Sequence, residues 1–273
     1  MQFVKAPLAG LEMNQSGWAE TGTLLSGRGF AATSRARHQE PLMEWNGTGG
    51  ELDFIQDYYD GMYGQGRIYW CDPYAAPVNL FPANWASPGV IESGDWPQIY
   101  TSATATFFVS TPTNSNGFPR TSAGYDVDTA VNTPTRTIFI PIPPGETLQL
   151  GFTGSVTGTG VVAYRTVLAD GTYGTVTALT PLVVSGAPRT NATITGDATT
   201  AVGVEVFVTR TTTATSSVTI SGLMARIALS AVNGSHVGGR GNTGYLFANP
   251  PGETYNYAAS RKARSAQFVE VDQ

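Results

Sequence analysis

The sequence has few charged residues, one cysteine, two histidines and no long apolar run. Charged residues make up 13% of the 273 positions, against roughly 25% in an ordinary soluble domain. The single cysteine, Cys71, excludes an internal disulfide framework and a cysteine-rich zinc site. No stretch approaches the ~18 apolar residues of a membrane span, so no membrane segment is predicted. The net charge of -5 argues against a protein that binds nucleic acid through basic charge, and no sequence-specific nucleic-acid binding is predicted.

Recognisable catalytic groups are also missing. There is no G-x-S-x-G motif, and no Cys-His signature surrounds Cys71. Asp57 and Asp60 lie on the same side of a predicted short helix, whereas a hydrolase needs an acid and a base that face each other across a cleft. We therefore expect a protein without enzymatic activity. The N-terminus has no sustained apolar stretch, which predicts synthesis in the cytoplasm without a secretory signal.

Two motifs superficially suggest ligands. His38 is followed by Glu40 and Glu44, but catalytic zinc usually takes two or more His among three protein ligands, and a surface strand explains the segment more simply. The segment GRGNTG at 239–244 matches G-x-G-x-x-G, yet Pro250 and Pro251 forbid the helix that a phosphate site requires. We therefore predict a turned loop there, with no metal and no cofactor.

Threonine dominates the middle of the chain. Residues 98–232 contain 30 Thr but only six acids and six Arg. Runs of β-branched residues alternate with Pro and Gly, as in Val204, Val206 and Val208 against Glu205 and Thr209. Strands are predicted at 103–110, 136–142, 146–153, 160–169, 172–184, 191–195, 202–211 and 216–229. About eight short antiparallel strands favour a mainly β fold with a sandwich of the jelly-roll type, similar to carbohydrate-binding modules.

The flanks have a different composition. The segment before residue 98 holds all five Trp, and Leu52, Ile55, Tyr59 and Met62 are spaced as one face of a short helix. Strands are predicted at 67–71 and near 245–247, 255–257 and 267–271. The last forty residues are too few for a core of their own. We therefore predict one discontinuous β-rich domain, 1–95 with 235–273, into which a sandwich domain at 98–232 is inserted, so that Trp70 and Tyr255 share a compact body.

An inserted sandwich of this kind suggests sugar binding, because exposed aromatic rings stack on the apolar faces of sugars. The rings available for a glycan site are Tyr100, Tyr125, Tyr164 and Tyr173. The alternative interpretation is that these residues cover the edge of the core or pack on a neighbour.

Both flanks carry aromatic and glycine-rich motifs. They are YDGMYG-x-G, YWCDPYA and NLFPANWASP within 55–88, and GGRGNTGYLFANPPGETYNYAASRKARSAQFVEV at 238–271. In these motifs the chain resembles the distal tail proteins, also called minor tail proteins, of long-tailed (siphovirus-type) bacteriophages, particularly those that infect actinobacteria. The resemblance implies a belt domain that assembles into a ring, commonly a hexamer, at the end of the tail tube. It also implies inserted domains that project from the ring, and no catalytic residues.

The resemblance gives the expected function and partners. The protein is expected in the virion, at the distal end of the tail, where the ring joins the tail tube protein to the tail-tip hub and other minor tail proteins. Aromatic residues are enriched in interface cores, which makes flank aromatics candidates for the belt core or the ring interface. These candidates are Tyr59, Tyr63, Tyr69, Trp70, Trp85, Tyr245 and Tyr255. The alternative function is a host-surface adhesin that binds cell-wall glycan through the inserted sandwich.

Overall fold

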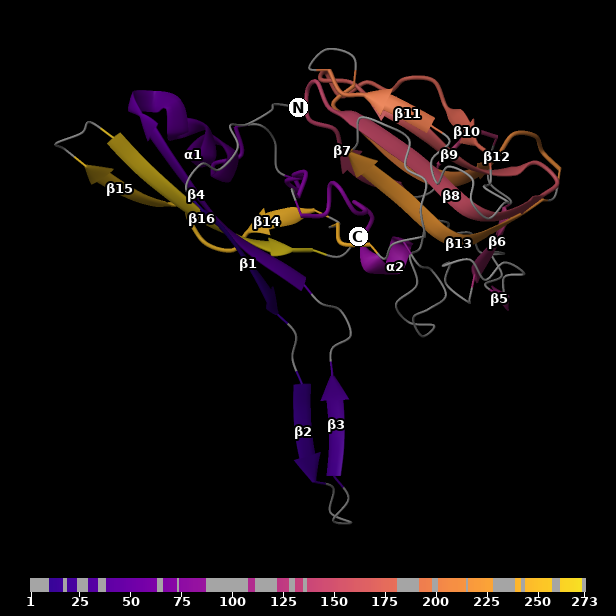
Figure 1. The fold of residues 1–273 in the computed structure, drawn as a ribbon, viewed down its shortest axis with the longest axis horizontal. Helices are drawn as coiled ribbons and strands as arrows, with labels where there is room; N and C mark the ends of the chain where they lie inside the picture. The colour runs from indigo at the N-terminus through magenta and orange to yellow at the C-terminus, as the bar shows by residue number, and fades with distance from the viewer. Residues whose placement is uncertain are drawn as a thin grey trace. The chain divides into compact units, whose positions relative to one another are not determined.

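The computed structural model shows a mainly β protein with several antiparallel sheets (Figure 1). It describes residues 10–16, 19–23, 29–33, 38–62, 66–72, 74–86, 108–110, 122–127, 131–134, 137–180, 192–197, 201–214, 216–227, 239–241, 244–256 and 261–271. The chain divides into two compact units. We call Tyr69–Asn242 the sandwich unit, and Gln2–Ile68 together with Thr243–Gln273 the split unit.

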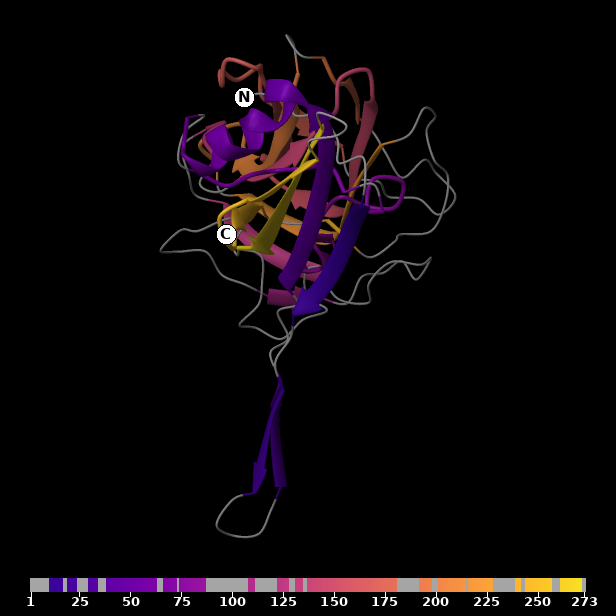
Figure 2. The same cartoon turned by 90° about the vertical axis from the view of Figure 1, so that its left-hand side faces the viewer.

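The split unit is built from both ends of the chain. Its elements are β1 (Gly10–Ser16), β2 (Ala19–Thr23), β3 (Gly29–Thr33), β4 (His38–Thr48), the 3-10 helix η1 (Gly49–Leu52), α1 (Asp53–Tyr59), β14 (Tyr245–Phe247), β15 (Gly252–Asn256) and β16 (Arg261–Glu270). Strand β16 lies between β4 on one side and β14 and β15 on the other (Figure 1), and β1 lies beside β4 (Figure 2). All these pairs are antiparallel. Strands β2 and β3 form a separate two-stranded sheet.

Side chains alternate across the split unit's main sheet, as the pleat of a strand requires. On β4, Met43 and Trp45 are buried while Glu44 and Asn46 are exposed. The buried face meets η1 and α1, because Leu52 and Ile55 are also buried and the rings of Trp45 and Phe54 meet edge to face at 6.4 Å. The sheet therefore has its apolar face covered by the short helix.

Arg264 of β16 connects this sheet to α1. Its side chain is 9% exposed and forms an ion pair with Glu253 of β15 at 2.5 Å and another with Asp53 of α1 at 3.7 Å. Its Nη1 also donates to Gln56 Oε1 at 3.4 Å. A buried guanidinium needs such partners, since an uncompensated charge in this position destabilises the fold strongly.

The sandwich unit consists of two antiparallel sheets and a short helix. Its elements are α2 (Ala83–Ala86), β5 (Phe108–Ser110), β6 (Ser122–Val127), β7 (Ile138–Pro141), β8 (Thr147–Thr157), β9 (Gly160–Val167), β10 (Thr177–Leu179), β11 (Ala192–Thr195), β12 (Gly203–Arg210) and β13 (Ser216–Ile227). One sheet has the order β10-β9-β12-β7 and the other β11-β8-β13-β6-β5. Both sheets contribute to one apolar core, which includes Ile140 and Val206 from the first and Leu150 and Ile220 from the second.

The strand pairs of the sandwich are nested. Strand β6 pairs with β13, β7 with β12, β8 with β11 and β9 with β10. Successive pairs alternate between the two sheets, so the eight strands run as one long antiparallel ribbon folded over itself. The pairs β8–β13 and β9–β12 then join the ribbon into continuous sheets.

The segment 71–86 contributes to the sandwich core and does not belong to the split unit. Leu80, Phe81 and Trp85 belong to the core shared by the two sheets. Asn79 is fully buried and joins the segment to β13: its Nδ2 donates to Leu223 O at 2.9 Å, and its Oδ1 accepts from Ala225 N at 3.1 Å. Asn79 Oδ1 also accepts from Phe81 N. One amide therefore satisfies backbone groups that would otherwise be buried without partners.

The glycines of GRGNTG pack against this same segment. Arg240 N donates to Asn79 O and Gly241 N donates to Phe81 O. A Cβ on Gly241 would lie 1.6 Å from Leu80 O, and a Cβ on Gly239 would lie 2.1 Å from Phe81 O. The G-x-G spacing thus permits a close approach of two backbone segments, which is a structural use of glycine.

The division of the chain differs from the predicted domain boundaries at residues 95 and 235. Tyr69, Trp70 and Trp85 lie in the sandwich unit, so Trp70 and Tyr255 belong to different compact units. The physical reason is that the apolar side chains of 75–86 are buried in the sandwich core. Composition alone could not reveal this, because these residues share the aromatic content of the preceding flank.

The predicted helix exists but is shorter than its apolar spacing suggested. Leu52 and Ile55 are buried, whereas Tyr59 is 41% and Met62 74% exposed. Helix α1 ends at Tyr59, and Gly61 adopts a φ of 77°, a left-handed conformation that favours glycine. Met62 therefore lies beyond the helix and outside its buried face.

Most predicted strands of the middle region overlap strands of the structure. The predicted strand at 67–71 is wrong: Ile68 makes only an isolated bridge with Tyr245. Strand β6 was not predicted, because SAGYDV has few β-branched residues and no clear alternation. Strands β1, β2 and β3 were also not predicted.

We expect the substitution Asn79→Ala to destabilise the sandwich by about 3 kcal/mol, because it leaves buried N–H and C=O groups unpaired. The measurement is chemical denaturation followed by the fluorescence of the tryptophans. The matched control is Asn249→Ala, an exposed asparagine, which should change stability by less than about 0.5 kcal/mol. Equal effects of the two substitutions would contradict the role assigned to Asn79.

Candidate functional site

The structure separates the four tyrosines predicted to contact glycan. Tyr164 of β9 is half-buried and packs against the sandwich core. Tyr173 lies on the connection between β9 and β10 and is 51% exposed. Tyr100 lies outside the described residues, and for Tyr125 only the backbone, in β6, is described. Tyr173 is therefore the candidate whose ring the structure places at the surface.

A tight turn positions Tyr173. Asp170 Oδ1 accepts hydrogen bonds from Thr172 N at 2.9 Å and Thr172 Oγ1 at 2.7 Å. These bonds hold the pKa of the Asp170 carboxyl below its usual value. Gly171 has a φ of 83°, and Leu168 N donates to Thr172 O, which closes the turn. The chain then returns along β9, where Tyr173 forms a bridge with Val167.

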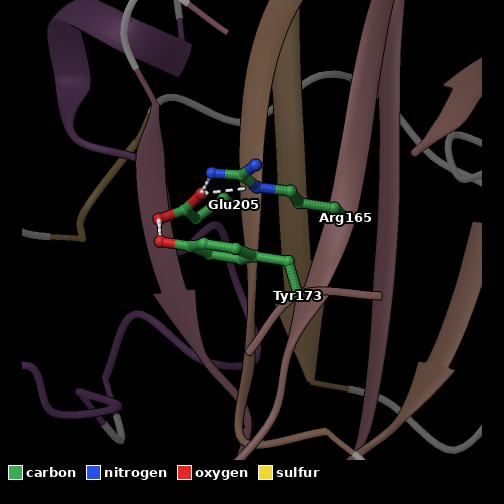
Figure 3. A network of polar contacts seen from close by, with 3 residues as sticks. All are labelled: Arg165, Tyr173 and Glu205. Atoms are coloured by element: carbon green, nitrogen blue, oxygen red, sulfur yellow. Dashed lines mark hydrogen bonds and ion pairs between the residues drawn. The ribbon is translucent and has the colours of Figure 1, made fainter. Parts of the chain in front are cut away.

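Arg165 and Glu205 lie beside Tyr173 and form an ion pair (Figure 3). They are direct partners in the register of β9 and β12. Arg165 donates to Glu205 Oε2 from Nε at 2.8 Å and from Nη2 at 2.6 Å. The Arg165 guanidinium lies 3.5 Å from the centroid of the Tyr173 ring, a cation–π geometry. Tyr173 Oη donates a long hydrogen bond of 3.5 Å to Glu205 Oε1.

The three side chains form a network suited to binding. The side chains of Arg165 and Glu205 are 19% and 14% exposed, so both charges are partly withdrawn from water yet compensate each other. The ring of Tyr173 offers an apolar surface beside polar groups, the combination that recognises sugars and other amphipathic ligands. Within this network no nucleophile is paired with a base.

Aromatic side chains continue beside the network. Phe139 of β7 is the partner of Glu205 in the register of β7 and β12. The ring of Tyr69 meets the ring of Phe139 at 4.8 Å, close to edge-on. Tyr69 thus packs on the outer face of the sandwich. The sequence instead predicted Tyr69 to lie in the core of the belt domain or at the ring interface.

Arg165 and Glu205 are not among the residues that the sequence predicted to bind glycan. Residues 98–232 contain only six acids and six Arg, so a charged residue at the outward position of a predicted strand was a usable signal. What the sequence could not give was the pairing of β9 with β12, which makes the two residues direct neighbours.

The remaining interface candidates fall into both units. In the split unit, Tyr245 is 1% exposed, and the ring of Tyr59 meets the ring of Phe247 at 5.5 Å. In the sandwich unit, Trp85 is 3% exposed and Trp70 is half-buried. Tyr63 lies outside the described residues, and for Tyr255 only the backbone in β15 is described. Tyr245 and Trp85 are therefore core residues of their own units, and Tyr59 keeps a partly exposed ring.

Cys71 lies against the sandwich core and is half-buried. Burial, together with the carboxylates of Asp72 and Glu146, raises the pKa of the Cys71 thiol to about 12. The thiol therefore stays protonated at neutral pH, which removes the nucleophilic form of cysteine.

Two features are absent from the residue ranges that the structure describes. In those ranges no group of three or more His, Cys, Asp or Glu side chains could hold a metal ion. None of the helices in the same ranges is long and apolar enough to cross a membrane. Comparison with protein-family models, with curated proteins and with solved structures found no match.

We expect Cys71 to resist alkylation by iodoacetamide at pH 8 in the folded protein, because its pKa of about 12 leaves almost no thiolate. In denaturant the same thiol should react within minutes, as an unperturbed cysteine does. Mass spectrometry of the alkylated chain measures both rates. Rapid modification of the native protein would contradict the described environment of Cys71.

Asp72 is buried, and desolvation raises the pKa of its carboxyl above its ordinary value, although its Oδ1 accepts a hydrogen bond from Tyr74 N. The folded state therefore holds this proton more tightly than the unfolded state. Folding gains stability as the pH falls through the folded pKa, and the ionised form opposes folding at neutral pH.

Asp72→Asn should consequently raise the melting temperature at pH 7, since asparagine keeps the side-chain oxygen without the buried charge. The advantage should shrink as the pH is lowered, because folded Asp72 takes up its proton at a higher pH than an ordinary aspartate and its charge is then lost. Thermal unfolding at several pH values measures this difference, with Asp57→Asn on α1 as the control. A constant difference across pH would show that the charge of Asp72 is not the cause.

Proposed function

We propose that this protein is a structural component of a bacteriophage virion, a ring-forming distal tail protein. In this role it joins the tail tube to the tail-tip hub and the host-adhesion apparatus. The observation that carries the proposal is the pairing of β4 with β16, which joins the two ends of the chain into one sheet around an inserted sandwich. That arrangement agrees with the belt and projecting domain implied by the resemblance of both flanks to distal tail proteins.

Features of the split unit favour self-association. Strands β2 and β3 pair with each other and with no other described strand. An isolated two-stranded hairpin is at best marginally stable in water, so the hairpin gains from contact with a neighbouring subunit. The outer edge of β1 also has no described partner strand and can pair with another chain. A closed ring would satisfy these groups on every subunit, and the resemblance implies a hexamer.

We propose that the inserted sandwich has the jelly-roll topology. Support comes from the nested pairs β6–β13, β7–β12, β8–β11 and β9–β10 and from their alternation between two sheets. An eight-stranded jelly roll has this arrangement: two packed sheets whose strands are joined by Greek-key connections. A scaffold of this kind can project from a ring without adding catalytic groups, which agrees with a non-enzymatic protein.

A second function is supported by the exposed ring of Tyr173. A host-surface adhesin needs an accessible aromatic ring with polar groups beside it, and Tyr173 with Arg165 and Glu205 provides both. The two functions are compatible, because a subunit can assemble through the split unit and contact cell-wall glycan through the sandwich.

The proposal predicts that the purified full-length chain forms a closed oligomer, which native mass spectrometry would detect as a multiple of 28.8 kDa. Replacing Ala19–Thr33, the hairpin β2–β3, by a short glycine linker should shift the mass toward the monomer, because the hairpin is expected to contact a neighbour.

Tyr173→Ala serves as the control and should leave the oligomer intact, because its ring belongs to the sandwich unit. Electron microscopy of purified particles should place the ring at the distal end of the tail. A protein that remains monomeric at high concentration and stays out of tail particles would contradict the proposal.

A further inference from the structure

The Tyr173 ring is held rigidly before any ligand arrives. The guanidinium of Arg165 covers one face of the ring at 3.5 Å, while 51% of the residue remains exposed. The turn at Asp170 and Gly171 fixes the backbone that carries it. A ligand that stacks on the ring therefore loses little affinity to ordering of the side chain.

Hydrogen-bonding capacity is left over beside the ring. Both hydrogen bonds from Arg165 end on Oε2 of Glu205, and among the residues that the structure describes Oε1 accepts only the long bond from Tyr173. An ionised carboxylate can accept about four hydrogen bonds, so Oε1 has room for another donor.

The charges at this site select for a neutral ligand. Arg165 and Glu205 compensate each other at 2.6 Å, so the pair carries no net charge. A phosphate or carboxylate would be repelled by Glu205 and would find Arg165 already paired, whereas a cation would be repelled by Arg165. A hydroxyl group can donate to Oε1 without disturbing the ion pair, and a hydrogen bond to a charged partner is stronger than one between neutral groups.

We infer that Tyr173, Arg165 and Glu205 form a subsite for one neutral pyranose ring. The sugar stacks the positively polarised C–H groups of one face on the negative face of the Tyr173 ring. The sugar occupies the face of the ring opposite Arg165, and one of its hydroxyls donates to Glu205 Oε1 at the edge of the ring. This inference rests on the second proposed function, the contact with host glycan, and it names the sugar class and the residues that bind it.

Saturation-transfer NMR and titration of the full-length protein test the inference. The probes are the methyl glycosides of glucose, galactose and N-acetylglucosamine, with glucuronate and glycerol 3-phosphate as anionic counterparts. At least one neutral glycoside should bind in the millimolar range, and the anions should bind more weakly. Tyr173→Ala should weaken the neutral sugar about tenfold, as expected for the loss of one stacked ring.

Two further variants separate stacking from folding. Tyr173→Phe keeps the ring and should stay within about threefold of the wild type, because the lost hydrogen bond is long. The matched control Tyr74→Ala removes a tyrosine that is 65% exposed and should leave sugar binding unchanged. Circular dichroism of each variant verifies that the sandwich remains folded.

The outcomes distinguish the inference from the functions on which it rests. Sugar binding that survives Tyr173→Ala overturns the subsite and leaves the adhesin function standing at another place on the sandwich. Tighter binding of glucuronate or glycerol 3-phosphate than of every neutral glycoside overturns the sugar class. Binding of none of the probes overturns both the subsite and the adhesin function, while ring assembly measured by native mass spectrometry is unaffected.

Discussion

The pairing of β4 with β16 is the interaction on which the architecture depends. It joins residues 38–48 to residues 261–270, so the split unit exists only when both ends of the chain are present. The buried face that this sheet forms is completed by α1, with Arg264 bonded to residues of both β15 and α1. The chain segment between β4 and β16 therefore begins and ends in neighbouring strands of one sheet. The sandwich is accommodated as an insertion in this segment.

In this arrangement each of the two units has its own proposed function. The split unit carries an unsupported hairpin and an open sheet edge, which favour contacts with further copies of the chain. The sandwich carries a rigid aromatic ring beside a compensated ion pair, which favours an uncharged, hydroxyl-rich ligand. Neither unit needs a reactive group for these roles. Cys71, whose pKa burial raises to about 12, is protonated at neutral pH.

Local patterns in the sequence predicted local structure well. The alternation of Val204, Val206 and Val208 identified a strand whose inner face is buried. Long-range features were not accessible in the same way. The register of β9 and β12 decides that Arg165 meets Glu205, and tertiary packing decides that Trp85 belongs to the sandwich core. Composition could not assign these residues, because aromatic side chains serve cores and interfaces equally.

Hydrogen exchange tests the split architecture most directly. The comparison is between the full-length chain and a chain that ends at residue 251 and therefore lacks β15 and β16. The account predicts that amides of β4 lose their protection in the shortened chain, while those of β8 and β13 exchange as slowly as before. Unchanged protection of β4, or a loss that spreads through the sandwich strands, would contradict it.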